Sequence, residues 1–269
     1  MNQDLKARLH LCKSSVQTSL PYTMRGLLFK NRKGETIYTL HTQEHSQKII
    51  EKLERITDIC NNVKNKKCHI NDESEFILYC SAWLHDLGCI ISRKNHGKLS
   101  NKIIQENSGL FEGITGYERL IGMICEVHTY DRKLKKDPIS KLPKEIVLEN
   151  GERLYPQYLA GIFRLADACD LDRKKAPKLV YMLLSQLMGK DSRKFWKAHS
   201  NVFSCGFIND KILITYFERT KYDNFIFNEL QKQFNEVYPI LQQYDFPIKQ
   251  IKSDYLPVKD NWRVYIKEK

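Results

Sequence analysis

A histidine and an aspartate stand side by side at the end of a strongly apolar run. His85 and Asp86 follow the segment 76–84, in which nearly every residue is apolar. Burying an imidazole and a carboxylate together is costly unless each has a strong partner, and a metal ion is a partner that suits both. The pair therefore indicates a metal site, with a hydrogen-bonded helix terminus as the alternative interpretation.

Four further side chains can join this pair as metal ligands. They are His45 before it in the chain and His96, His128 and Asp167 after it. The order H…HD…H…H…D supplies nitrogen and oxygen ligands without thiolates, a set that suits Mn, Fe, Co, Ni or Zn better than Mg. Taken alone, His96 and His128 also fit core or surface histidines. The whole pattern predicts a metal-dependent hydrolase.

The number of ligands matches two divalent transition-metal ions. One ion would be held by four of them: His45, His85, Asp86 and Asp167. His96 and His128 would complete a second ion, with the carboxylate of Asp86 as the bridge. Two ions about 3.5–4 Å apart can activate a water and clamp a phosphoryl oxygen. We therefore expect Asp86 and His85 to be the catalytic residues and a metal-bound hydroxide to be the nucleophile.

The spacing of apolar residues places these ligands on helices. His45 lies four residues before Ile49, on the apolar stripe of a helix predicted to begin after Thr42. His128 and Asp167 likewise lie on the apolar stripes of two later predicted helices. The ligands are therefore expected to face inward near the ends of five helices, which is how an all-α scaffold builds a central metal site.

Signals at the helix ends refine this arrangement. Asn71 or Asp72 is expected to cap the helix that ends with the His-Asp pair, and Gly88 to stop it. Asn95 is expected to cap the helix that opens with His96. The polar loop 131–151 has the length of a lid over the site or of a disordered segment. After Pro177 one more helix is expected, ending near residue 188.

The C-terminal part of the chain has a different texture. Residues 202–208 and 211–217 predict two strands joined near Asn209-Asp210, followed by a helix over 222–244 and a short strand over 248–255. The sequence thus predicts a mainly α fold with a small C-terminal α+β appendage. The expected division is an N-terminal helix and loop over 1–36, a helical core over 37–198 and a β-β-α-β appendage over 199–269.

Composition bounds the class of protein. An apolar content of 42% is ample for a core, and no stretch approaches the roughly 20 apolar residues that cross a bilayer. The first residues lack the layout of a secretory signal, so we expect a cytosolic protein with no membrane partner. The eight cysteines are scattered without a C-x-x-C pair, which favours buried free thiols over disulfides or a zinc knuckle.

The net charge of +12 favours an anionic partner, such as a nucleotide, polyphosphate or nucleic acid. Basic residues cluster near the expected site, and guanidinium groups match phosphate oxygens. We predict substrate contacts for Arg164, Arg173 and Lys133. His41, one turn before His45, would orient a ligand, contact substrate or face solvent. Asp170 would pair with Arg173 or orient a ligand, and the pairing with Arg173 is the favoured interpretation.

Three segments of the chain resemble the HD-domain metal-dependent phosphohydrolases. They are His45-Ser46, the run Leu84-His85-Asp86-Leu87-Gly88, and the run from Arg164 to Asp170. The resemblance covers roughly residues 37–180 and implies an HD-domain helical core; His96 and His128 resemble the additional histidines of its two-metal branch. The run from Arg164 is similar to HD proteins of prokaryotic defence operons and to the helical half of exopolyphosphatases. The guanosine-tetraphosphate hydrolases of this superfamily have a Glu-Asp dyad after their HD pair. Leu87-Gly88 stands there instead, so this branch is set aside.

Three functions remain open at this point. The first is hydrolysis of a phosphoester or phosphoanhydride bond in a nucleotide-like or other phosphorylated small molecule. The second is an HD-type nuclease acting on single-stranded DNA or RNA, for which the positive charge would contact the backbone. The third is a non-catalytic ligand-sensing or assembly module of a defence-type complex, with the C-terminal appendage as the surface for a protein partner.

Overall fold

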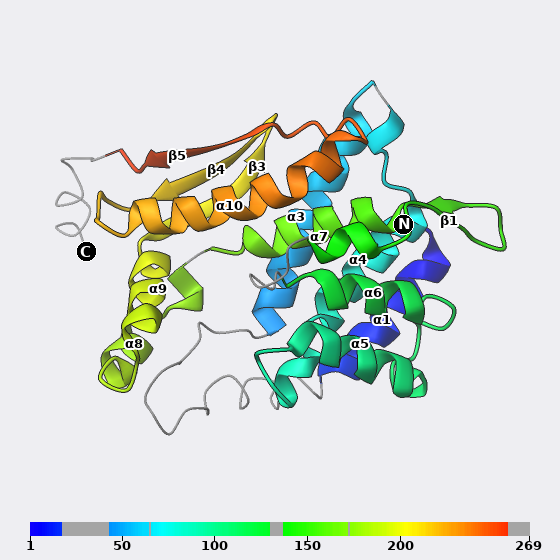
Figure 1. The fold of residues 1–269 in the computed structure, drawn as a ribbon, viewed down its shortest axis with the longest axis horizontal. Coiled ribbons are helices and arrows are strands. Elements are labelled where there is room, and N and C mark those ends of the chain that lie inside the picture. Colours follow the sequence, from blue (N-terminus) through cyan, green and yellow to red (C-terminus); the bar gives the residue numbers. More distant parts are fainter. Residues whose placement is uncertain (18–42, 65, 130–136, 172, 258–269) are drawn as a thin grey trace, which may run out of the picture.

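The computed structural model describes residues 1–17, 43–64, 66–129, 137–171 and 173–257. Helices dominate these segments, and two small sheets complete them (Figure 1). The helices are α1 (Gln3–Gln17), α3 (Gln43–Asn62), α4 (Asp72–Leu84), α5 (His96–Glu106), α6 (Glu118–Val127), α7 (Pro156–Ala168), α8 (Lys178–Leu184), α9 (Lys190–Ser200) and α10 (Asp223–Gln242). The strands are β1 (Ile146–Val147), β2 (Arg153–Leu154), β3 (Val202–Ile208), β4 (Lys211–Tyr216) and β5 (Gln250–Tyr255).

Helix α4 forms the centre of the helical part, as its apolar sequence predicts. All of its residues from Phe76 to Leu84 are buried, and α1, α3, α6 and α7 pack around it. Asn71 caps the helix by accepting a hydrogen bond from the backbone N–H of Ser74, at 3.0 Å. The helix ends at Leu84, just before the predicted His-Asp pair, with His85 as its C-cap. The His-Asp pair therefore stands where the chain leaves the middle of the core.

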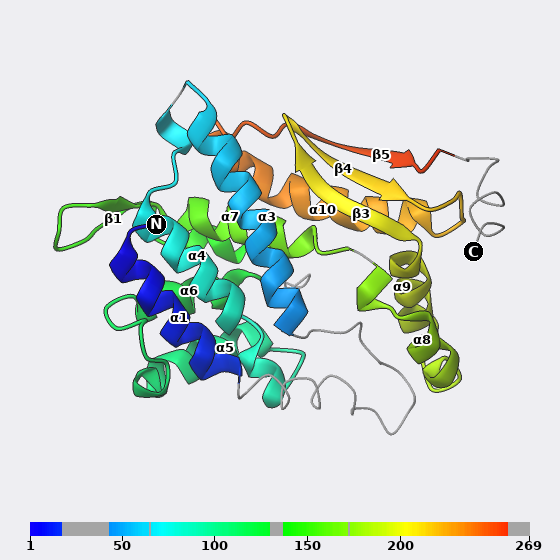
Figure 2. The ribbon, with the colours of Figure 1, turned by 180° about the vertical axis from the view of Figure 1, so that it is seen from behind.

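The C-terminal strands form one sheet in the order β3-β4-β5. β3 and β4 are an antiparallel hairpin whose turn holds Asn209 at a φ of 53°, a left-handed conformation that asparagine tolerates. β5 runs parallel to β4, and α10 is the crossover between them, lying along one side of the sheet (Figures 1 and 2). The predicted order of strand, strand, helix and strand is confirmed.

One apolar core connects this sheet to the helices. Gly161 of α7 lets Leu241 and Val237 of α10 approach closely, because a Cβ at Gly161 would lie 3.0 Å from a methyl carbon of Leu241. Buried side chains of β4, including Ile212 and Ile214, belong to the same continuous cluster as those of α4 and α7. The small α+β part is thus packed onto the helical core.

The region between α7 and the sheet departs from the sequence prediction. One helix was expected to end near residue 188, but the chain forms α8 and then the unpredicted α9. These two helices have a small core of their own around Ala176, Met188 and Trp196. In both views they lie away from α1, α4, α5 and α6, with α9 next to the start of α10 (Figures 1 and 2).

The structure also tests the predictions made for the polar loop and for the cysteines. The loop expected over 131–151 is partly ordered, because 137–154 contains a 3₁₀ turn (Pro138–Lys141) and the β1–β2 hairpin; residues 130–136 lie outside the described residues. All eight cysteines are free and buried, as predicted. Within the described ranges, no helix has the length and apolar character needed to span a membrane.

Candidate metal centre

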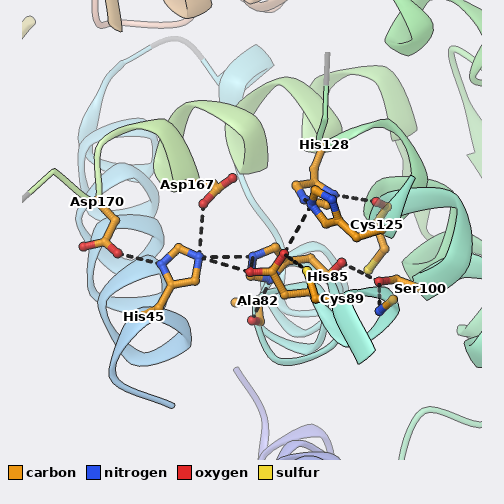
Figure 3. A network of polar contacts seen from close by, with 12 residues as sticks. His45, Ala82, His85, Cys89, Ser100, Cys125, His128, Asp167 and Asp170 are labelled. Atoms are coloured by element: carbon orange, nitrogen blue, oxygen red, sulfur yellow. Dashed lines mark hydrogen bonds and ion pairs between the residues drawn. The ribbon is translucent and has the colours of Figure 1, made fainter. Parts of the chain in front are cut away.

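The structure brings the six predicted ligands together from the ends of five helices. His45 is in the first turn of α3 and His96 opens α5, while His85 and His128 are the C-caps of α4 and α6. Asp86 follows α4 directly, and Asp167 lies in the last turn of α7. The four histidines are each at most 5% exposed and Asp86 is 8% exposed. We name these six residues the ligand cluster; Figure 3 labels His45, His85, His128 and Asp167 among them.

The carboxylate of Asp86 faces two groups of ligands at once. Its Oδ2 lies 3.3 Å from Nε2 of His85 and 3.7 Å from Nε2 of His45. Its Oδ1 lies 3.3 Å from Nε2 of His96. Asp167 closes the first group, with its Oδ1 3.3 Å from Nε2 of His45. The two oxygens of Asp86 thus face different histidines, and both are placed where they could serve as ligands of a divalent ion.

The other ring nitrogen of each histidine has an acceptor of its own. Nδ1 of His85, His96 and His128 donates to the backbone carbonyl of the third residue before it, at 3.0, 2.7 and 2.5 Å. Nδ1 of His45 donates to Oδ2 of Asp170 at 2.6 Å. A carbonyl oxygen can only accept, so a neutral histidine bonded in this way carries its proton on Nδ1 and leaves Nε2 bare.

The bare Nε2 atoms point at one another. Those of His45 and His85 are 3.2 Å apart, and those of His96 and His128 are 3.0 Å apart. Two nitrogen lone pairs at such distances repel unless a proton or a cation lies between them. Imidazole nitrogens oriented by a partner on their far side are the usual ligands of transition metals. The donor set and its orientation therefore fit divalent ions.

Burial and charge set the protonation of these histidines. Desolvation holds the pKa of His128 well below its usual value, with further lowering from His96 and His85. Desolvation also lowers the pKa of His96. Burial alone would lower the pKa of His85, but the carboxylate of Asp86 outweighs it and raises that pKa. Burial thus keeps His96 and His128, the histidines of the second group, neutral, as a metal ligand must be.

Asp170 orients His45, which corrects the favoured prediction that it would pair with Arg173. Its Oδ2 also forms an ion pair with Nζ of Lys175, at 3.0 Å, and both residues are buried. Burial would raise the pKa of Asp170, but Lys175 and His45 outweigh it and hold that pKa well below its usual range. Asp170 therefore stays ionised and fixes the tautomer of His45.

A close contact between α5 and the His-Asp turn sets the position of His96. Ser100 of α5 donates to the carbonyl of His85 at 2.5 Å and accepts from the backbone N–H of Gly88 at 2.8 Å. A Cβ at Gly88 would lie 2.1 Å from the carbonyl oxygen of His96. Gly88, predicted as a helix stop, is therefore required because another backbone lies against it.

Two residues beside Asp86 were not singled out from the sequence. Nη1 of Arg93 lies 3.2 Å from Oδ1 of Asp86 and donates to Sγ of Cys89 at 3.5 Å. Burial raises the pKa of the Cys89 thiol, which donates to the same carboxylate oxygen. Arg93 is 26% exposed at its side chain. It places a positive charge at the solvent side of the second group.

The residues predicted to contact substrate lie apart from the ligand cluster or outside the described residues. Arg164 is 2% exposed and donates to Asp137 and to the backbone carbonyl of Val127, so it fixes the end of α6 that carries His128. Arg173 is exposed and lies over the ring of Phe217, 4.9 Å from its centroid. The structure brings neither of them into the ligand cluster. His41 and Lys133 lie outside the described residues.

A comparison with known families agrees with this geometry. Residues 36–231 match the family model HD-CE, which covers most of the chain. The chain belongs to the HD-CE family. The HD-CE match contains all six members of the ligand cluster and continues through β3 and β4 into α10. The resemblance to an HD-type domain is thereby confirmed. No curated relative matches the sequence.

Proposed function

We propose that this HD-CE protein is a two-metal phosphohydrolase that cleaves a phosphoester or phosphoanhydride bond of a nucleotide-like substrate. One observation carries the proposal: four imidazoles, each with Nδ1 bonded to an acceptor, turn their Nε2 atoms toward one another in two pairs beside one buried carboxylate. A single ion would leave one pair of lone pairs unsatisfied. Two ions would satisfy both pairs, with His45, His85 and Asp167 to hold the first, His96 and His128 to hold the second, and Asp86 to help hold both.

The residues around the cluster have separate roles in this proposal. When bound, two divalent ions supply Lewis acidity for a phosphoryl oxygen and lower the pKa of a water. Asp86 would help to hold both ions, and Asp170 holds the proton of His45 on Nδ1 and so turns Nε2 toward the cluster. Arg93 takes the role predicted for Arg164, because its guanidinium lies at the solvent side of Asp86 and can bind a phosphate oxygen.

The test is turnover with defined metals and substrates. The full chain is loaded with Mn, Ni or Fe and assayed with nucleoside triphosphates, cyclic dinucleotides and inorganic polyphosphate, the last because of the resemblance to exopolyphosphatases. We expect hydrolysis that Asp86→Ala abolishes and Asp58→Ala, a matched change on the exposed side of α3, leaves intact. Circular dichroism confirms that both variants fold.

The results also decide between the proposal and its alternatives. Hydrolysis that persists in Asp86→Ala, or that is absent with every metal, contradicts the proposal. Tight metal binding without turnover would support the non-catalytic module instead.

A nuclease is the second candidate, and the net charge of +12 together with the basic face of α9 favours it. The assay that separates the two uses single-stranded oligonucleotides at low and high salt. Binding to a nucleic acid backbone releases counterions, so a nuclease would lose much of its affinity at high salt. Hydrolysis of a small substrate in the buried cluster would change far less. Cleavage of oligonucleotides in preference to mononucleotides would replace the first proposal with the second.

A further inference from the structure

A second concave site lies on the α8–α9 part of the molecule, away from the ligand cluster. It is a cavity of about 720 Å³ between α8, α9 and the turn before α10. Five cations line it: Lys190, Arg193, Lys194, Lys197 and Lys221. Tyr181 and Tyr222 contribute aromatic walls, and Asp191 is the one acidic residue of the lining. We name this site the cation pocket.

The cations of α9 form a single stripe. Lys190, Arg193, Lys194 and Lys197 are spaced at three and four residues, so they share one face of the helix. The opposite face carries the buried Trp196, which packs into the small core with α8. α9 is therefore fixed by its apolar face and presents its basic face to the cavity.

This stripe is not neutralised as lysines are in other helices. In α3, α5 and α10 an exposed or half-buried lysine pairs with a glutamate four residues away, as Lys102 does with Glu106. None of the five pocket cations forms an ion pair with any described residue. Like charges at this spacing destabilise a helix, and gathering them in a concavity raises the local potential. The arrangement fits an anion.

Aromatic rings hold the ammonium groups without neutralising them. Nζ of Lys194 lies 3.8 Å from the ring centroid of Phe225. Nζ of Lys197 and of Lys221 lie 5.7 and 5.5 Å from the ring centroid of Tyr222. Cation–π contacts of this kind fix position and preserve the full charge. The positive groups are thus positioned toward one cavity before any ligand binds.

We propose that the cation pocket binds the polyphosphate chain of a small ligand, at a site separate from the metal centre. The cavity volume lies within the range of about 300–1,000 Å³ that is usual for small-molecule sites. Five cations against one carboxylate match a chain of three or more phosphates, and the guanidinium of Arg193 can bind two phosphate oxygens at once. An inorganic polyphosphate and a nucleoside triphosphate share this chemistry.

The experiment is calorimetric titration of the full chain with tripolyphosphate and, separately, with ATP, in EDTA. Chelation keeps metal out of the ligand cluster, so failure of the proposed hydrolysis would not affect this result. The pocket variant is Lys194→Gln with Lys197→Gln. Its control is Lys249→Gln with Lys252→Gln on the exposed surface of β5 and the turn before it, which changes the net charge equally.

We expect binding of one tripolyphosphate per chain, weakened about tenfold or more in the pocket variant and less than about twofold in the control. Tighter binding of ATP than of tripolyphosphate would add a base contact at the tyrosines, and equal binding would assign the affinity to the chain alone. No binding to the native chain, or an equal loss in both variants, would overturn the proposal. Preferential binding of an oligothymidylate that depends on the pocket lysines would also overturn it and assign the site to single-stranded nucleic acid.

Discussion

The ligand cluster and the cation pocket each gather side chains of one kind, but the molecule holds them differently. In the cluster, every imidazole is buried and has a hydrogen-bond acceptor on its far nitrogen. In the pocket, the cations are exposed, and aromatic rings contact three of them, Lys194, Lys197 and Lys221. The cluster depends on each of its fixed side chains, whereas the pocket can lose one cation and keep the others in place. Single substitutions should therefore act sharply in the cluster and gradually in the pocket.

The largest effect is expected at the residue that both halves of the cluster share. Asp86→Asn removes the bridging charge while keeping the shape of the side chain. We expect its affinity for Mn to fall by at least about 100-fold, because outer partners of metal ligands alone contribute about 10–100-fold. Calorimetric titration with Mn measures this affinity, and Asp58→Asn on the surface of α3 is the control. An unchanged affinity would show that the two halves do not depend on Asp86.

The next effect concerns the backbone contact that positions His96. Gly88→Ala adds a methyl group 2.1 Å from the carbonyl oxygen of His96, so α5 must move or the turn must open. We expect a loss of about 2–4 kcal/mol in the free energy of unfolding, measured by urea denaturation. Gly109→Ala is the matched control, because a Cβ there meets nothing within 4 Å. Equal stability of the two variants would contradict the close packing described here.

A smaller effect is expected from the partner of His45. Asp170→Asn keeps all six ligands but removes the charge that fixes the tautomer of His45, so the affinity for Mn should fall by about 10–100-fold. Lys175→Met breaks the ion pair with Asp170 and leaves its contact with His45 in place. If both variants lose the same affinity, Asp170 acts through general stability and does not orient the ligand.

The smallest effect separates the two sites by salt. Raising the salt from about 0.05 M to about 0.5 M should weaken tripolyphosphate binding at the exposed pocket about fivefold or more, because exposed charges are screened. Binding of Mn to the buried cluster should change by less than about twofold over the same range. Similar salt dependence at both sites would remove the distinction drawn between them.

Much of the ligand set was predictable because His45, His128 and Asp167 continue the apolar stripes of their own helices. His45 precedes Ile49 by four residues, and Asp167 follows Phe163 by four, so helical periodicity alone turns them inward. The strands of the C-terminal sheet were predictable for the same kind of reason, since β-branched and aromatic residues fill 202–208 and 211–216.

The partners of these ligands were not predictable from local pattern. Asp170 lies 125 residues from His45, and its neighbour Arg173 was the simpler partner until the fold placed Lys175 beside it. Arg164 stands next to the ligand helix end in sequence, yet its side chain points into the core. α9 was missed because its stripe of cations hides the apolar face around Trp196. The signal for α9 in the sequence is the helical spacing of its cations, Lys190, Arg193, Lys194 and Lys197.

The most direct test of the account is a crystal of the full chain grown with manganese, with anomalous scattering used to locate the ions. We expect two anomalous peaks about 3.5–4 Å apart. One oxygen of Asp86 should lie on each ion, with His45, His85 and Asp167 around the first and His96 and His128 around the second. A single peak that Asp86 does not touch, or no peak within the ligand cluster, would contradict it.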